Sequence, residues 1–365
     1  MEAAGLAANY APRTPQLRRG RRVVPMHTLT KYTLAALALT TLAAAVVVAT
    51  AAATSPGKNG PIAFRRYFTD DQSWGAVFTV GADGKGARQV THPERGVVDD
   101  QPDWAPDGSL LAFTRCAPEA LCHIWVIKPD GTGLAPVGAL CASGSHEDTC
   151  PDDANPSFSP DSKQVSFTQS SGRVKSDPVV DNIIEHSALT VMNVDGSNRH
   201  VIYQGPAYSA DLTYAMFSPS GKQLLFERVN SGFSKPAGKR AVFVVNTDGS
   251  GLKRLTQWGD TAGDNPDWSP DGKWILYHTH VDEPGAQYFL IHPDGTGGHQ
   301  LTHFPARGVQ IRSASFSPDG TWIVFSKGPE SGNAHVYTMR LDGSHIQRVT
   351  QSALWDSAPD WGPAK

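Results

Sequence analysis

The chain has 365 residues, of which 39% are hydrophobic and 18% charged, and its formal net charge is −3. Residues 1–53 hold six Lys or Arg and one Glu, so the rest of the chain keeps 26 basic and 34 acidic residues and a net charge of −8. Such an acidic domain is repelled by phosphate backbones, which excludes nucleic acid as the expected partner. The remaining length predicts one large domain and no second one.

Residues 1–53 differ from the rest in composition. Four Arg between residues 18 and 22, then Lys31, precede an uncharged run over 32–53 that is rich in Ala, Leu and Val. This pattern is typical of a cleaved export signal. An uncleaved membrane anchor stays open, because about 20 apolar residues also span a bilayer, and Met26 is an alternative start. We expect an exported protein, periplasmic or extracellular, whose only membrane contact is this segment.

The next feature is a repeat. The motif Asp267-Trp268-Ser269-Pro270-Asp271-Gly272, followed by an alternating apolar run, recurs along the chain. An aromatic residue follows five positions after the turn Gly, or after Ser162 in one copy. These aromatic residues are Phe113, Phe167, Phe226, Tyr277 and Phe325, and Phe64 holds the same place in an incomplete first copy. Their spacing of 48 to 59 residues is typical of propeller blades.

Each repeat predicts four antiparallel strands. In the fifth copy these are 266–269, 274–278, 287–292 and 300–302, with the turn Asp294-Gly295 before the last. Five residues before the corresponding Asp-Gly turns stand aromatic residues in all repeats but one, namely Phe78, Trp125, Phe243, Phe289 and Tyr337, with Thr190 as the exception. We interpret these aromatics, and Trp104, Trp268 and Trp361, as core. The turn Asp residues are expected to cap their own backbone.

Four cysteines fit export. Cys116 and Cys122 flank a five-residue loop, and Cys141 and Cys150 flank eight residues of the next connection. Local disulfides are plausible, although four cysteines allow three connectivities. Reduced structural thiols are the alternative if the protein stays in the cytosol.

The two ends of the repeat region complement each other. The first copy lacks its inner strand, whereas Pro359-Asp360-Trp361 at the far end matches Pro102-Asp103-Trp104. We therefore predict an all-β fold, a six-bladed β-propeller over residues 54–365, closed by pairing of the C-terminal strand with the N-terminal blade. A closed ring has no free sheet edge, so a monomer is expected.

The Ser-Pro-Asp-Gly turn, the aromatic residue five positions later and endings such as Asp248-Gly249-Ser250 to Leu255-Thr256 resemble the TolB-type propeller repeats. The resemblance covers residues 55–365. It implies a binding propeller, although similar repeats also occur in propellers of prolyl-oligopeptidase-like enzymes and in oligogalacturonate lyase.

Residues that precede the inner strands are expected to ring the channel mouth, on the face that also carries the long loops. The predicted ring is mostly acidic and polar: Asp100, Gln101, Asp153, Asn155, Tyr214, Asp264, Asn265, Arg312 and Asp356. Such a funnel suits a cation, a basic peptide terminus or a sugar hydroxyl. The alternative interpretation is a set of capped loops around water.

No Gly-x-Ser-x-Gly nucleophile motif occurs, which argues against a serine peptidase. His278 and His280 alternate onto one side of a strand, and His92, His146, His186 and His303 occur in or beside predicted loops. The first hypothesis is an exported, non-catalytic module that binds a protein segment or an envelope glycan and needs no cofactor. The alternative is a propeller carbohydrate lyase or hydrolase with a divalent metal held by loop histidines and acids.

Overall fold

The described part of the protein is built from β-strands. A computed structural model describes residues 57–117, 121–141, 150–177, 182–208, 210–259, 264–279, 285–305, 307–329 and 331–365, and no helix occurs in these ranges. None of the described residues therefore forms a helix of the length and apolarity that a membrane span needs. These residues belong to one compact unit, 49–365. The predicted signal or anchor over 1–53 lies outside the described residues.

The strands form antiparallel groups of four, which we number as sheets 1 to 6 and list from the first strand to the last. Sheet 1 contains β26 (Trp355–Pro363), β1 (Asn59–Tyr67), β2 (Gly75–Val80) and β3 (Arg88–Gln89). Sheet 2 contains β4 (Val98–Trp104), β5 (Leu111–Cys116), β6 (His123–Ile127) and β7 (Ala135–Pro136). A parallel bridge between Gly75 and Val98 joins these two groups.

The other groups follow the same order. Sheet 3 contains β8 (Asp152–Phe158), β9 (Gln164–Ser171), β12 (His186–Asn193) and β13 (His200–Gln204), and the short pair β10 (Lys175–Ser176) and β11 (Asn182–Ile183) follows β9. Sheet 4 contains β14 (Ala210–Phe217), β15 (Gln223–Asn230), β16 (Arg240–Asn246) and β17 (Lys253–Arg254). Sheet 5 contains β18 (Asp264–Trp268), β19 (Ile275–His278), β20 (Tyr288–Ile291) and β21 (His299–Gln300). Sheet 6 contains β22 (Gln310–Phe316), β23 (Trp322–Gly328), β24 (His335–Arg340) and β25 (Gln347–Arg348).

The repeated aromatic residues form the core between sheets. Phe64, Phe113, Phe167, Phe226 and Phe325 are fully buried, and Tyr277 is half-buried. Each faces the second repeated position on the next strand, as in the pair Phe226 and Phe243, and Phe167 faces the exceptional Thr190. Trp104, Trp268 and Trp361 are also buried, which confirms that they pack in the core and are not exposed to a ligand.

The turns follow the predicted chemistry. In the turn before β17, the Asp248 carboxylate accepts bonds from the Ser250 backbone N–H, at 2.9 Å, and from its hydroxyl, at 2.6 Å. These bonds lower the pKa of Asp248, and they confirm that the turn carboxylate caps its own backbone. Ser162 replaces Gly in a turn where φ is +60°, a left-handed conformation that most residues avoid.

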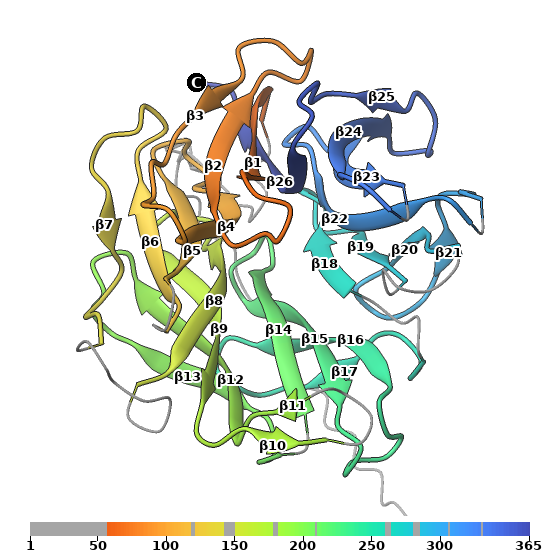
Figure 1. The fold of residues 1–365 in the computed structure, drawn as a ribbon. Helices are drawn as coiled ribbons and strands as arrows, with labels where there is room; N and C mark the ends of the chain where they lie inside the picture. Colours follow the sequence, from red (N-terminus) through yellow and green to blue (C-terminus); the bar gives the residue numbers. More distant parts are fainter. Residues whose placement is uncertain are drawn as a thin grey trace, which may run out of the picture. The chain divides into compact units, whose positions relative to one another are not determined.

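The first strands of the sheets are neighbours in space. Each contacts two others in the order β26, β4, β8, β14, β18, β22 and again β26, and they lie around a common centre in Figure 1. The last strand, β26, pairs with β1, where Ile62 faces Trp361. Beside this pair, Ala364 N donates to Lys58 O at 2.8 Å. These contacts bring residues from both ends of the described region to the same central site.

Candidate binding site at the centre of the sheets

A β-bulge interrupts the first strand of each sheet at an equivalent position. The pairing of β4 with β5 shifts between Asp100 and Asp103, and β8, β14, β18, β22 and β26 show the same shift. In five of these strands the extra residue has a positive φ, between 43° and 59°: Gln101, Asn155, Tyr214, Asn265 and Ala358. We call these five the bulge residues. Such a bulge takes a residue out of the ladder and turns its side chain away from the sheet.

The bulge residues line a small central cavity. Its volume is about 60 Å³, and all six first strands contribute to its wall. In β22 the lining residue next to the bulge residues of the other strands is Ser313. The amide of Asn265 donates to Ser313 Oγ at 3.0 Å, and that of Asn155 donates to Thr168 Oγ1 at 3.3 Å. The cavity therefore offers neutral amide, hydroxyl and phenol groups to a ligand.

Three carboxyl groups lie deeper in the same cavity. Asp103, Asp267 and Asp360 each accept a bond from a backbone N–H of the next first strand, of Phe158, Phe316 and Trp104 respectively, at 2.7 to 2.8 Å. The little surface that they expose faces the cavity. Each of these carboxyls therefore connects one sheet to the next by a hydrogen bond.

Burial and mutual repulsion set the ionisation of these carboxyls. Burial raises the pKa of Asp267 to about 8 and that of Asp360 to about 6. Burial, together with the negative charge of Asp360, also raises the pKa of Asp103 well above its ordinary value. Three neighbouring acids in a space with little water hold protons more strongly than exposed ones do.

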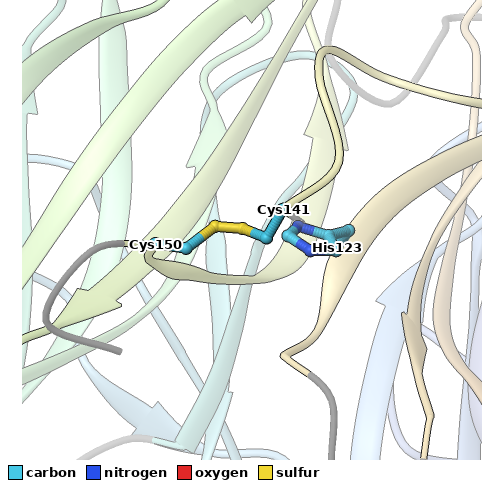
Figure 2. A group of neighbouring side chains, drawn as sticks. All are labelled: His123, Cys141 and Cys150. Atoms are coloured by element: carbon cyan, nitrogen blue, oxygen red, sulfur yellow. A yellow bond between two sulfur atoms is a disulfide. The ribbon is translucent and has the colours of Figure 1, made fainter. Parts of the chain in front are cut away.

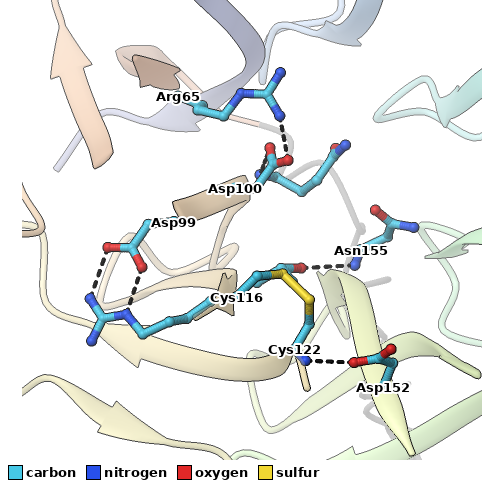
Figure 3. The surroundings of a disulfide bond; sticks show 10 residues. Arg65, Asp99, Asp100, Cys116, Cys122, Asp152 and Asn155 are labelled. Atoms are coloured by element: carbon cyan, nitrogen blue, oxygen red, sulfur yellow. Dashed lines mark hydrogen bonds and ion pairs between the residues drawn. A yellow bond between two sulfur atoms is a disulfide. The ribbon is translucent and has the colours of Figure 1, made fainter. Parts of the chain in front are cut away.

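Arginines neutralise acids that the sequence places at the mouth. Asp100 pairs with Arg65 (Figure 3). Nη2 of Arg65 also donates to Ser357 Oγ at 2.6 Å. Asp356 accepts two bonds from Arg66, at 2.6 and 3.0 Å. Both arginines come from β1, and they balance one acid of β4, Asp100, and one of β26, Asp356.

A third mouth acid is paired in the same way. Asp153 accepts two bonds from Arg199, both at 2.7 Å. Because Asp100, Asp153 and Asp356 all have an arginine beside them, their negative charges are balanced. At these positions the expected acidic funnel is a set of ion pairs.

The structure thus divides the predicted mouth residues. It brings together Gln101, Asn155, Tyr214 and Asn265 as bulge residues that line the cavity. Arg312 is not part of the described cavity wall, and its guanidinium lies 4.7 Å from the Trp355 ring centre. Asp264 belongs to β18, but its side chain lies outside the described residues. Sequence reasoning missed the deep carboxyls, although the repeated Pro-Asp-Trp triplet marks them. It also missed the arginines, although a basic residue recurs two positions after the repeated aromatic residue, as Arg66, Arg115, Arg228 and Lys327.

Two local disulfides connect the four cysteines, Cys116 to Cys122 and Cys141 to Cys150. Figure 3 shows the first beside the mouth. Cys122 N donates to Asp152 Oδ1 at 2.5 Å and its carbonyl accepts from Asp153 N at 3.0 Å. This disulfide loop is therefore tied to the start of β8.

Possible metal ligands do not converge on the mouth. Within the described ranges, the group of donors close enough to share a metal ion is His123, Cys141 and Cys150 (Figure 2). Both sulfurs are in the disulfide, so they lack the thiolate form that binds zinc. His278 is buried, with Nδ1 at 2.7 Å from Thr279 O, and His146 and His280 lie outside the described residues.

Comparison with known proteins agrees with this architecture. A family model described as the TolB beta propeller domain matches residues 153–365. TolB from Acinetobacter baumannii aligns with a TM-score of 0.64 and 19% identity over 84% of this chain and 67% of that one. Hydrazine synthase from Kuenenia stuttgartiensis aligns with a TM-score of 0.66 and 14% identity over 85% of this chain and 47% of that one. Both similarities concern the fold.

A curated relative is similar over a short stretch. Dipeptidyl-peptidase 5 of Porphyromonas endodontalis is 42% identical over 88 residues, which are 24% of this chain and 12% of that protein. The alignment thus spans about an eighth of the relative's length. The family match, in contrast, covers more than half of this chain and agrees with the all-β sheets described above. The chain therefore belongs to the TolB beta propeller domain family.

Proposed function

We propose that the chain is an exported, non-catalytic binding module, a closed six-bladed propeller that holds a protein segment over its channel mouth and long-loop face. The six groups of four strands, the cyclic order of first-strand contacts and the pairing of β26 with β1 support the closed ring. The segment over residues 1–53 and the two disulfides support export, because disulfides persist in oxidising compartments.

The observation that carries the proposal is the set of five left-handed bulge residues. Each left-handed residue other than Gly costs about 1–2 kcal/mol, and Ala358 and Tyr214 have no special tolerance for it. Strain of this kind persists where the surrounding structure enforces it, and it gathers at ligand sites. The bulges turn four polar side chains toward one point, which the unbroken strands would not do.

The size of the cavity favours a surface ligand. Pockets that enclose small molecules measure about 300–1,000 Å³, whereas this cavity of about 60 Å³ holds only a few water molecules. A partner can insert a single polar group there and must make its other contacts on the surrounding loops. The amides of Asn155 and Asn265 both donate and accept, as recognition of a peptide backbone requires.

Photocrosslinking at the mouth tests this proposal. A photoreactive amino acid in place of Tyr214 is expected to capture a discrete protein from the envelope and secreted fractions of the source cells. Asn155→Ala with Asn265→Ala should abolish capture, because the mouth then loses two amide groups. The same probe in place of Lys222, at the turn between β14 and β15, is the control and should capture nothing specific.

Two results would contradict the proposal. Equal capture from positions 214 and 222 would show that the mouth has no special role. Labelling of a polysaccharide alone would replace the protein segment by a glycan as the ligand.

A further inference from the structure

Four polar side chains share one side of sheet 6, away from the central cavity. Lys327 on β23 faces His335 on β24, and Tyr337 on β24 faces Arg348 on β25. Phe325 faces Tyr337 in the same ladder. Because residues opposite each other and residues two apart point to the same side of a sheet, all four side chains project together.

These side chains line a pocket of about 500 Å³. Gly308 and Val309, which precede β22, also line the pocket, and so do Pro329, Asn333 and Ala353. Among the described residues, no carboxylate belongs to this lining. The space is much larger than an inorganic ion needs and accommodates a short peptide segment.

The two cations of the pocket have no acidic partner in the part of the chain that the structure describes. The Lys327 ammonium lies 4.6 Å from the ring centre of Tyr337 and 5.3 Å from that of Phe304. Arg348 uses Nε and Nη2 to donate to the carbonyls of Thr350 and Ser352, at 2.7 and 3.2 Å. Its Nη1 is left for a ligand. Arg65, Arg66 and Arg199 at the mouth differ, because each of these three binds a carboxylate of the chain itself.

His335 adds a third polar group. Its Nδ1 is buried and has no hydrogen-bond partner among the described residues, a situation that normally costs free energy unless a further group or water supplies the bond. Burial, and then the positive charge of Arg348, lower the pKa of His335. The neutral imidazole can donate one hydrogen bond.

We propose that this pocket binds the carboxylate of an acidic peptide segment, as a site distinct from the channel mouth. Lys327 and Arg348 supply the positive charge, and charge-assisted hydrogen bonds to a carboxylate are the strong class of such bonds. Val309, Pro329 and Ala353 contact the apolar part of the segment. Lys327 covers the Tyr337 ring, so no bare aromatic face is left on which a sugar could stack.

Binding of a capped glycyl-glutamate dipeptide to the whole chain tests the proposal. The His335 imidazole resonance is followed by NMR during the titration, with the glycyl-glutamine dipeptide as the uncharged counterpart. We expect a saturable shift with glutamate only. Lys327→Gln and Arg348→Gln should each weaken the affinity about tenfold, as loss of one charge-assisted bond predicts, and the double variant should show no saturation.

Controls separate this site from other charges and from the mouth. Arg340→Gln removes a cation from β24 of the same sheet, where the guanidinium lies 4.8 Å from the ring centre of Trp322, and should leave the affinity unchanged. Asn265→Ala at the mouth should also leave it unchanged, whether or not the mouth binds a protein. Equal shifts with both dipeptides, or wild-type affinity in the double variant, would overturn the site. Saturation by galacturonate or inorganic phosphate without the dipeptide would overturn the peptide assignment.

Discussion

Asp267 connects the chemistry of the central cavity to the stability of the fold. Its carboxylate accepts backbone bonds from Trp268 and Phe316, and burial raises its pKa from 3.8 to about 8. The unfolded chain releases this proton near pH 4, whereas the folded chain keeps it until about pH 8. Unfolding between these values therefore releases a proton, so the free energy of unfolding falls as the pH rises through this window.

We predict that Asp267→Asn makes this decline shallower. Asn stays neutral at every pH, so the contribution of Asp267 itself, roughly 1 kcal/mol per pH unit, disappears, and the pKa of Asp103 loses the part of its rise that the Asp267 charge causes. Urea unfolding at pH 5, 6, 7 and 8 measures the slope. Asp248→Asn, in an exposed turn whose carboxyl has a lowered pKa, should retain the wild-type slope. Parallel curves for wild type and Asp267→Asn would contradict the prediction.

Among the elements, β26 packs closely against its neighbours. A Cβ added at Gly362 would lie 2.5 Å from a ring carbon of Trp104 on β4, whereas one added at Gly298 would lie 3.6 Å from the Ile291 side chain. Neither glycine has a positive φ. The two positions therefore differ in space and not in the backbone conformation that they require.

Gly362→Ala is expected to destabilise the protein by about 1–3 kcal/mol, the usual effect of overpacking, and Gly298→Ala should change stability much less. Thermal unfolding of both variants makes the comparison. Equal melting temperatures would mean that β26 can move away from β4 at little cost, against the close packing described here.

The elements also show what the sequence can predict. Turns such as Asp248-Gly249 and aromatic pairs such as Phe226 and Phe243 were predictable, because their causes lie within a few residues or one repeat. The bulges could not be predicted from the sequence, because their left-handed residues differ in type from strand to strand. Ion pairs such as Arg199 with Asp153 join residues far apart in sequence at positions that the repeat does not fix.

At the scale of the whole molecule, the contacts between the first strands predict tolerance to a changed chain order. Residues 57 and 365 lie beside the same strand pair, with Ala364 bonded to Lys58. We expect a circular permutant, joined from residue 365 to residue 57 by a short linker and opened between Asp342 and Gly343, to fold and unfold cooperatively. Its melting temperature should be within a few degrees of that of residues 57–365 in the natural order.

The matched comparison is a chain of residues 57–365 that lacks residues 355–365 and therefore β26. Its loss exposes the edge of β1 and the hydrophobic cores on both sides of β26. This variant should aggregate or unfold at a much lower temperature. Circular dichroism and size-exclusion chromatography distinguish these outcomes. A stable truncated chain would contradict the proposed closure of the ring by this strand.

The mouth combines Arg65 of the earliest described strand with Ser357 and Ala358 of the last one. During synthesis, a chain that has emerged only as far as β25 lacks part of the proposed binding surface, and Arg65 and Arg66 still lack their β26 contacts. Ligand capture would then begin only when the final strand docks. Premature termination or trimming by a protease would silence binding even if the other sheets survived.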